Sequence, residues 1–313
     1  MIRLAVRVRR AQAELVLAEL LELAPEGVEE VDLGPQEIEY AVYGSPGELP
    51  GLPDLKAAAG GALVEISTSE LPEDWPERWK RFHRPVLIEA PATQLTGEHR
   101  LPDIRVRPPW EPAAHDAQQR LQEIVIDPGQ AFGTGAHATT RLCLELLLEL
   151  AASEGPDGAL LDVGTGSGLL AIAASRLGFM PVLAVDNERE SVDAARENAA
   201  LNGAELEVRR LDLRSQPLPW LDGGPHPSPP VIVVANLLRP LLLELARGMA
   251  HPPSHLIAGG LLNDEVDDVI NAFAAHGLRE RTRRQSGEWA VAWLSPRAQA
   301  GSGTSVAART IAR

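Results

Sequence analysis

The feature that most constrains the fold of this chain is a short apolar run that ends in alternate glycines. The run Leu160-Leu161-Asp162-Val163 leads into Gly164, Gly166 and Gly168, and an apolar helical pattern follows over 169–177. Glycine allows a tight turn and lets a ligand approach the backbone without a Cβ in the way. The pattern therefore predicts a strand, a ligand-binding loop and a helix, which together begin a unit of a parallel sheet.

Strand and helix patterns alternate along the rest of this larger unit. We expect strands at 86–88, 104–106, 122–126, 159–163, 181–185, 206–208, 231–234 and 255–258, and helices at 139–150, 169–177, 191–202, 240–249 and 265–276. Alternation of this kind predicts an α/β fold, with a doubly wound parallel sheet covered by helices on both faces. Ligands of such sheets bind outside the carboxyl ends of the strands.

A smaller unit precedes it. Residues 1–70 show strand patterns at 2–8, 30–33, 38–42 and 62–67 and helical patterns at 11–23 and 53–59. The order βαββαβ predicts a ferredoxin-like α+β domain. This architecture hosts many functions, so it predicts none by itself.

Residues 71–83 are expected to form a linker helix between the two units. Trp75, Trp79 and Phe82 fall at positions i, i+4 and i+7, on one face of that helix. This stripe either packs the linker against a domain or forms a substrate-facing wall. The larger unit is expected over 84–297, with an irregular loop at 216–230 and a disordered tail at 298–313.

Composition excludes several classes of protein. The chain of 313 residues holds one cysteine, which rules out a disulfide scaffold, and no Cys and His cluster has metal-ligand spacing. The 29 Lys and Arg against 44 Asp and Glu give a net charge of −15, which opposes direct DNA binding and favours a basic partner or a solvated surface. Without a signal peptide or a membrane span in the sequence, a cytoplasmic location is expected.

The glycine loop indicates the kind of cofactor. A dinucleotide fingerprint places its third glycine or an alanine where this chain has Leu169. Asp162, just before the loop, would repel a pyrophosphate but attract an aminoacyl ammonium. The loop, with Gly164 and Gly166, therefore favours S-adenosylmethionine over NAD.

Two further acids follow at the ends of the next strands. Asp186 lies one helix and one strand after Asp162, where a carboxylate can accept hydrogen bonds from both ribose hydroxyls. Asp212 is a candidate for the adenine amino group. Either acid could instead cap the helix or turn that follows its strand. For Asp186 the ligand role is favoured, whereas for Asp212 the two roles are evenly balanced.

An unusual glycine-rich segment precedes the cofactor loop. We expect this segment to fold over the cofactor, with Phe132 covering an apolar part and His137 or Thr139 reaching its carboxylate. The alternative is a plain turn and helix start with Thr139 as cap. The segment's candidate residues are Phe132, Gly133, Thr134, Gly135, His137 and Thr139.

The apolar strand expected at 231–234 continues through Ala235 and ends in Asn236. An amide at the carboxyl end of a strand can orient a nucleophilic nitrogen through its Oδ1. We therefore expect Asn236 to be catalytic and to lie beside the cofactor. The chain lacks Asn-Pro-Pro-Tyr at this strand end, the signature of amide-directed methyltransferases, which favours an aliphatic amine as substrate.

These segments together resemble the PrmA family of bacterial methyltransferases of ribosomal protein L11. The resemblance rests on Glu73-Asp74-Trp75, on the run from Asp127 through Phe132-Gly133-Thr134-Gly135 to Thr140, and on Asn236-Leu237-Leu238. It implies a substrate-recognition domain, a hinge helix and a class I methyltransferase domain with a Rossmann-like sheet. It also implies methylation of lysine side chains and of the N-terminal amine of L11.

The expected function is thus S-adenosylmethionine-dependent protein N-methylation, with ribosomal protein L11 as substrate and with no metal and no membrane involved. Two alternatives stay open. The first is a methyltransferase of the same fold that acts on another protein lysine or on a small molecule, although residues 1–70 argue against a small substrate. The second is a protein that binds the cofactor without turnover.

Overall fold

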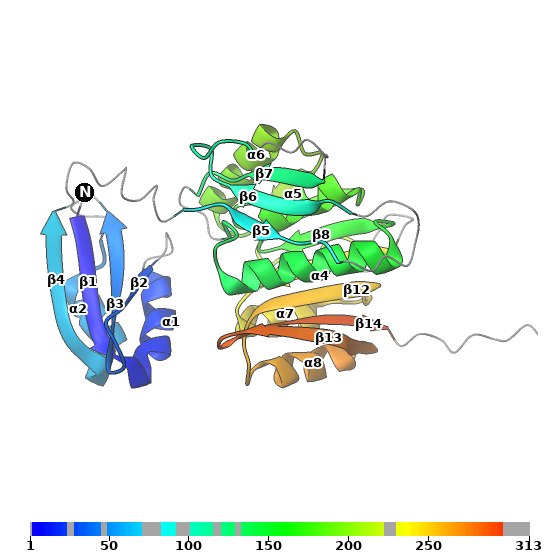
Figure 1. The fold of residues 1–313 in the computed structure, drawn as a ribbon. Coiled ribbons are helices and arrows are strands. Elements are labelled where there is room, and N and C mark those ends of the chain that lie inside the picture. Colours follow the sequence, from blue (N-terminus) through cyan, green and yellow to red (C-terminus); the bar gives the residue numbers. More distant parts are fainter. Residues whose placement is uncertain are drawn as a thin grey trace, which may run out of the picture.

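The computed structural model describes residues 2–23, 28–44, 49–70, 83–91, 101–114, 120–128, 133–221 and 230–296 (Figure 1). These residues form sheets of four, three and seven strands. Residues 71–82 of the linker helix predicted at 71–83, Phe132 and the predicted tail lie outside the described ranges. None of the described helices is both long and apolar enough to cross a membrane.

The N-terminal sheet has the predicted ferredoxin-like topology. Its elements are β1 (Ile2–Arg9), α1 (Ala13–Leu23), β2 (Glu29–Asp32), β3 (Glu37–Gly44), α2 (Leu52–Ala59) and β4 (Leu63–Glu70). The strands are antiparallel in the order β2-β3-β1-β4. Leu4, Val6 and Val8 are buried at every second position, so that one face of β1 joins a core with the two helices.

The seven-stranded sheet forms the centre of the larger unit. Its strands are β8 (Ala159–Val163), β9 (Val182–Asp186), β10 (Glu207–Arg210), β11 (Val231–Asn236), β12 (His255–Leu262), β13 (Leu278–Ser286) and β14 (Trp289–Pro296). They lie in the order β10-β9-β8-β11-β12-β14-β13. The strands from β8 to β12 are parallel, and the order reverses between β8 and β11, which is where ligands of such sheets bind.

Helices cover both faces of this sheet, as predicted. The helices are α4 (Ala138–Glu154), α5 (Leu169–Leu177), α6 (Arg189–Asn202), α7 (Arg239–Gly248) and α8 (Val266–Ala274) (Figure 1). Apolar residues of α4, α5 and α6 share one core, and those of α7 and α8 share the other. The doubly wound fold class is therefore confirmed.

The last two strands correct the expectation of a purely parallel sheet. Strands β13 and β14 form a hairpin, and β14 pairs antiparallel with β12. The segment Leu278–Ser286 carries charged or polar residues at every position after Leu278, which alone is buried in β13. Its arginines form ion pairs, such as Arg283 with Asp267. The sequence of this edge strand is therefore as polar as that of a solvent-exposed loop, and it gave no strand signal.

The strand predicted at 122–126 does not belong to the main sheet. β5 (Val86–Ile88), β6 (Asp103–Arg107) and β7 (Leu121–Val125) form the separate three-stranded sheet. Asn202 of α6 accepts from the backbone N–H of Val125 at 2.8 Å and donates to its carbonyl at 2.7 Å. Because this side chain uses both backbone groups of Val125, α6 covers that edge of β7 in place of another strand.

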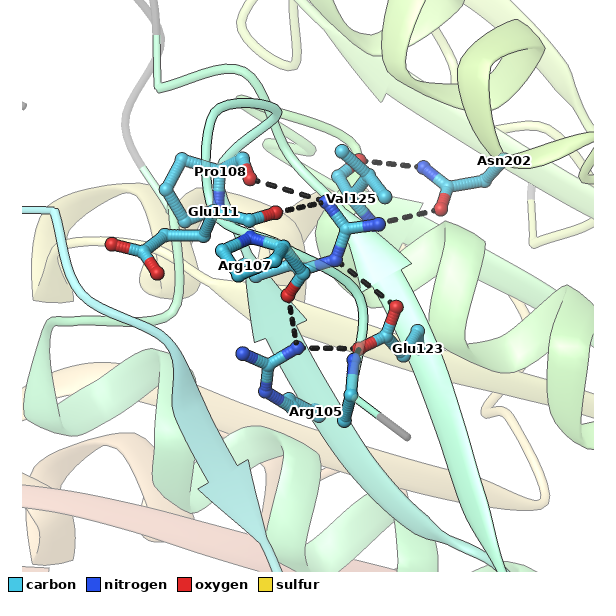
Figure 2. Close-up of polar contacts among 9 residues, drawn as sticks. Arg105, Arg107, Pro108, Glu111, Glu123, Val125 and Asn202 are labelled. Atoms are coloured by element: carbon cyan, nitrogen blue, oxygen red, sulfur yellow. Dashed lines mark hydrogen bonds and ion pairs between the residues drawn. The ribbon is translucent and has the colours of Figure 1, made fainter. Parts of the chain in front are cut away.

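An ion-pair cluster supports the same sheet. Figure 2 shows Arg105 and Arg107 of β6 directed at the carboxylate of Glu123 on β7. The guanidinium of Arg107 also donates to the carbonyl of Glu111 at 2.8 Å, and the backbone N–H of Ala114 donates to Glu123 at 2.8 Å. These contacts hold the loop after β6 against the sheet.

Candidate active site

The glycine turn between β8 and α5 has a backbone that only glycine adopts easily. Gly164, Gly166 and Gly168 have φ of 73°, 52° and 84°. A Cβ on Gly164 would lie 2.2 Å from Cδ2 of Leu237, and one on Gly168 would lie 3.1 Å from the backbone of α6 at Ala195. The turn thus packs against the segment after β11 and against α6, at the point where the strand order reverses.

Asp162 holds the glycine turn from inside. Its fully buried carboxylate accepts through Oδ2 from the Thr165 hydroxyl at 2.6 Å and from the backbone N–H of Ala171 at 3.1 Å. Its Oδ1 is buried and has no hydrogen-bond partner among the described residues. Burial raises the pKa of Asp162 to about 7, and the charge of Asp186 acts in the same direction.

This raised pKa predicts a pH-dependent stability. The folded state keeps the proton up to about pH 7, whereas the unfolded chain releases it near pH 4, so stability falls as pH rises through this window. Between pH 5 and pH 7 we expect Asp162 to lower the free energy of unfolding by about 2 kcal/mol. Asp162→Asn should remove this part of the pH dependence in urea unfolding. Equal slopes in the two proteins would contradict the assignment.

Asp186, at the end of β9, meets the same turn from the second strand. Its Oδ2 accepts from the backbone N–H of Gly166 at 2.9 Å, and its Oδ1 accepts from that of Glu188 at 3.1 Å. Burial raises the pKa of Asp186. Helix α6 begins at Arg189 with Glu188 as its N-cap residue, so Asp186 stands before the helix and does not cap it.

Asp212 lies farther along the same edge, after β10. It closes a turn, because its Oδ1 accepts from the backbone N–H of Arg214 at 2.9 Å and its Oδ2 from the Ser215 hydroxyl at 3.0 Å. These hydrogen bonds lower its pKa. Together with Asn187, Arg210 and Gln216 it lines a surface depression. The part that Asp212 plays in closing this turn is thus observed directly, whereas its contact with the adenine amino group stays a prediction.

The segment after residue 132 lies against the glycine turn. The Ser167 hydroxyl donates to the carbonyl of Gly133 at 2.9 Å, and Nδ2 of Asn198 donates to the carbonyl of Ser167 at 2.8 Å. Gly135 is buried, and a Cβ on it would lie 3.3 Å from both Leu169 and Val106. Thr134 between the two glycines is half-buried.

Ser167 and Asn198 were not among the predicted site residues. Both are buried, and Asn198 lies on α6 one turn from the buried Ala195 and from the buried Asn202. A signal was present in the sequence, since Asn198 and Asn202 stand four residues apart on the otherwise apolar face of this helix. Buried amides need partners, and here they bind backbone groups of neighbouring segments.

The start of α4 corrects the predicted cap. The helix begins at Ala138, and its N-cap residue is His137, whose Nδ1 accepts from the backbone N–H of Thr139 at 3.3 Å. The same Nδ1 lies 2.8 Å from the Thr139 hydroxyl, and the ring packs edge-on against Trp289 with centroids 4.8 Å apart. The imidazole thus takes the position that was predicted for the Thr139 side chain, and burial lowers its pKa.

Asn236 ends β11 with its amide between α4 and the glycine turn. Its Nδ2 donates to the Thr140 hydroxyl at 3.3 Å, and its Oδ1 is buried with no hydrogen-bond partner in the described part of the chain. A small cavity lies beside the amide. It is lined by Gly133, Thr140, Gly164, Thr165, Leu169, Leu170 and Asn236.

This cavity joins three segments that the sequence analysis selected separately: the segment after residue 132, the glycine turn and the end of β11. Gly133, Gly164 and Asn236 all line it. A buried acceptor that no described residue pairs with, at a switch point of a parallel sheet, is suited to orienting a polar substrate group.

Comparisons with known proteins match this arrangement. A sequence model of the family "Ribosomal protein L11 methyltransferase (PrmA)" matches residues 56–295. The protein named "Ribosomal protein L11 methyltransferase" from Geobacter sulfurreducens is 38% identical over 243 residues, which cover 76% of this chain and 72% of the relative. The protein of the same name from Syntrophotalea carbinolica is 37% identical over 233 residues, which cover 72% and 69%.

A solved structure agrees. The crystal structure of a ribosomal protein L11 methylase from Lactobacillus delbrueckii subsp. bulgaricus is 32% identical, with a TM-score of 0.52 over 62% of this chain and 94% of that chain. The resemblance seen in the sequence is thereby confirmed. On the family match and on relatives above 30% identity over most of their length, the chain belongs to the PrmA family of ribosomal protein L11 methyltransferases.

Proposed function

We propose that this protein is an S-adenosylmethionine-dependent N-methyltransferase that methylates lysine and N-terminal amines of ribosomal protein L11. The observation that carries the proposal is the buried Oδ1 of Asn236, which has no hydrogen-bond partner among the described residues and belongs to a side chain that lines the cavity beside the glycine turn. A neutral amine is a hydrogen-bond donor that this acceptor lacks. Family membership and the names of the relatives support L11 as the source of that amine.

The residues present fit S-adenosylmethionine as cofactor. Oδ1 of Asp162 is a second buried acceptor without a partner among the described residues, and an ammonium nearby would offset the cost of burying that charge. The Asp186 oxygens accept from the backbone N–H groups of Gly166 and Glu188 but keep lone pairs for ribose hydroxyls. In this proposal the remaining contacts come from Gly164 and Gly166 of the turn.

The other proposed contacts surround these central ones. Asp212 is proposed for the adenine end of the cofactor. The segment that includes Gly133, Thr134 and Gly135 would cover the cofactor, with Phe132 against an apolar part. His137 and Thr139 at the start of α4 are proposed for the carboxylate end.

The chemistry divides between cofactor and protein. When bound, S-adenosylmethionine supplies a methyl group that is already activated by its sulfonium. Oδ1 of Asn236 accepts one N–H of the neutral amine, which leaves the nitrogen lone pair free to point at that methyl group. Asn236 would thus hold the amine nitrogen in line with that methyl group, and the methylated amine, which carries the positive charge, would release its proton afterwards.

The amine must lose a proton before it reacts. A lysine with a pKa of about 10.4 is almost fully protonated at pH 7 in water. The walls of the cavity include Leu169 and Leu170, which are buried. Transfer of the ammonium into these surroundings disfavours its charged form, so the site itself promotes the neutral nucleophile.

Residues 1–70 are proposed to recognise the protein substrate, ahead of a linker over 71–83 and a catalytic unit over 84–297. The N-terminal sheet and its helices have a hydrophobic core of their own, around Val6, Leu20 and Leu55, that shares no residue with the cores of the main sheet. A unit with its own core can present a binding surface independently of the transfer site.

Asp186→Ala is expected to weaken binding of S-adenosylmethionine by about 1.5 to 3 kcal/mol, the range for hydrogen bonds to a charged group. Isothermal calorimetry measures this directly, with Asp193→Ala on the exposed face of α6 as matched control. A parallel titration with NAD should show no saturable binding. Unchanged affinity in the Asp186 variant would remove this residue from the cofactor site.

Mass spectrometry tests the proposed function itself. Ribosomal proteins from cells with and without this gene should differ by multiples of one methyl group on L11. The purified protein with S-adenosylmethionine should restore that mass to unmethylated L11. Methyl groups on another protein instead would assign the other substrate, and binding of the cofactor without any transfer would favour a non-catalytic protein.

A further inference from the structure

We propose that Asn198 of α6 is a positioning residue for the cofactor, because its amide ties the glycine turn to the chain that leaves β7. This inference rests on the proposed function. Asn198 is 2% exposed. Its Oδ1 accepts from the backbone N–H of Asp127 at 3.0 Å, and its Nδ2 donates to the carbonyl of Ser167 at 2.8 Å. One side chain therefore joins two segments that are far apart in sequence.

The partners of this amide fix its orientation. A backbone N–H can only donate, and a backbone carbonyl can only accept. The oxygen must therefore face Asp127 and the nitrogen must face Ser167, since the reversed amide would make neither hydrogen bond. A side chain that lacks either the donor or the acceptor cannot hold both segments.

The contacts continue from Ser167 to the cavity. The Ser167 hydroxyl donates to the carbonyl of Gly133 at 2.9 Å. Gly133 lines the cavity together with Gly164 and Thr165 of the glycine turn. The described residues that line this cavity do not include Asn198. Asn198 therefore acts on the site through Ser167 and the turn.

Helix α6 brings three contacts to the glycine turn. Asp186, just before the helix, accepts from the backbone N–H of Gly166 at 2.9 Å. One turn before Asn198, the backbone of Ala195 lies so close to the turn that a Cβ on Gly168 would be 3.1 Å from it. The amide of Asn198 makes the third contact. The helix thus acts as a frame for the turn, and Asn198 extends that frame to the chain after β7.

The decisive variant is Asn198→Ala, which removes both hydrogen bonds. The carbonyl of Ser167, a residue with no exposed surface, then loses its partner, and the turn gains other arrangements in which this carbonyl is satisfied. A ligand that binds only one arrangement loses apparent affinity in proportion to the fraction of molecules that adopt it. We expect the dissociation constant of S-adenosylmethionine in calorimetry to rise by about tenfold, which corresponds to a competent fraction of about one tenth.

The same helix supplies a matched control. Asn202 lies one turn farther along α6, is 6% exposed and binds both backbone groups of Val125 (Figure 2). Its remaining hydrogen bond goes to the carbonyl of Asn198 within the helix, so its side chain has no hydrogen bond to the described glycine turn. Asn202→Ala should lower the midpoint of thermal unfolding about as much as Asn198→Ala does. It should leave the dissociation constant within about twofold of the wild type.

A double-mutant cycle tests whether the contacts act in series. Ser167→Ala removes the hydroxyl that binds Gly133 and keeps the carbonyl that binds Asn198. This change should raise the dissociation constant by itself. In the Ser167→Ala background, Asn198→Ala should raise it by a smaller factor than in the wild type, since the connection to Gly133 is already broken.

Three outcomes would overturn the inference. They are a wild-type dissociation constant in Asn198→Ala, an equal rise in Asn202→Ala, and effects of Asn198→Ala and Ser167→Ala that simply multiply. If Asn198→Ala does not fold, Asn198→Ser enters the same measurements with Asn202→Ser as its control. A wild-type protein that binds no S-adenosylmethionine would refute the proposed function, whereas normal binding by the wild type and by Asn198→Ala would refute this inference alone.

Discussion

Replacing Asn236 by alanine is expected to lower the turnover of L11 methylation by at least about a hundredfold, because small misplacements of reacting groups have effects of that size. The substitution removes the amide of a residue that lines the cavity, including the buried Oδ1 that has no hydrogen-bond partner in the described ranges. The affinity for S-adenosylmethionine should change far less. Single-turnover rates and calorimetry on the same preparation measure the two quantities separately.

Two further variants sharpen this experiment. Asn236→Asp keeps the shape of the side chain and an acceptor, but its charge would be buried beside the glycine turn and would stabilise the protonated amine, so slow turnover is expected here too. Asn263→Ala, at an exposed asparagine after β12, is the matched control. Full turnover in Asn236→Ala would leave this residue a purely structural role, and an equal loss of cofactor binding would make it a cofactor ligand.

Local patterns predicted the segments in which one stretch of sequence contains the whole signal. The strand at 159–163 and the helix at 169–177 have the predicted bounds. Here a fully buried strand is apolar except at Asp162, and the glycines mark the positive-φ turn directly. The N-terminal βαββαβ order was predictable for the same reason, since the apolar residues of each element recur with the period of a strand or of a helix.

Segments defined by distant contacts were not predictable in this way. β7 has a normal strand pattern, but its edge is covered by Asn202, which is 77 positions away in sequence from Val125. β13 is polar at almost every position because it is an edge strand whose arginines pair with acids of the helices, such as Arg284 with Glu149. Periodicity describes the burial of one segment and contains no information about which partner covers it.

The same distinction holds for the site. Asn236 and Asp186 were predicted because they end strands, where a parallel sheet exposes its ligand-binding edge. Thr140 was not selected as a site residue, because a threonine in the first turn of a helix is ordinary there. Only the fold reveals that its hydroxyl lies 3.3 Å from the amide of a residue 96 positions away.

Removal of residues 1–70 is expected to lower kcat/KM for intact L11 by at least about a hundredfold, since a second binding module raises the effective concentration of a tethered partner by two to four orders of magnitude. The proposed cofactor residues lie outside the removed segment. The hydrophobic cores of the main sheet include no residue of the N-terminal core. The shortened chain should therefore fold and bind S-adenosylmethionine with unchanged affinity.

The contrast between two substrates decides what residues 1–70 contribute. A short lysine peptide reaches the transfer site without the N-terminal unit, so its methylation should be equally slow in the full and the shortened chain. Intact L11 should be methylated rapidly by the full chain alone, and adding residues 1–70 as a separate polypeptide should not restore the rate, because the gain arises from covalent linkage. If the shortened chain methylates L11 as fast as the full chain, the main sheet recognises the substrate by itself and residues 1–70 have another role.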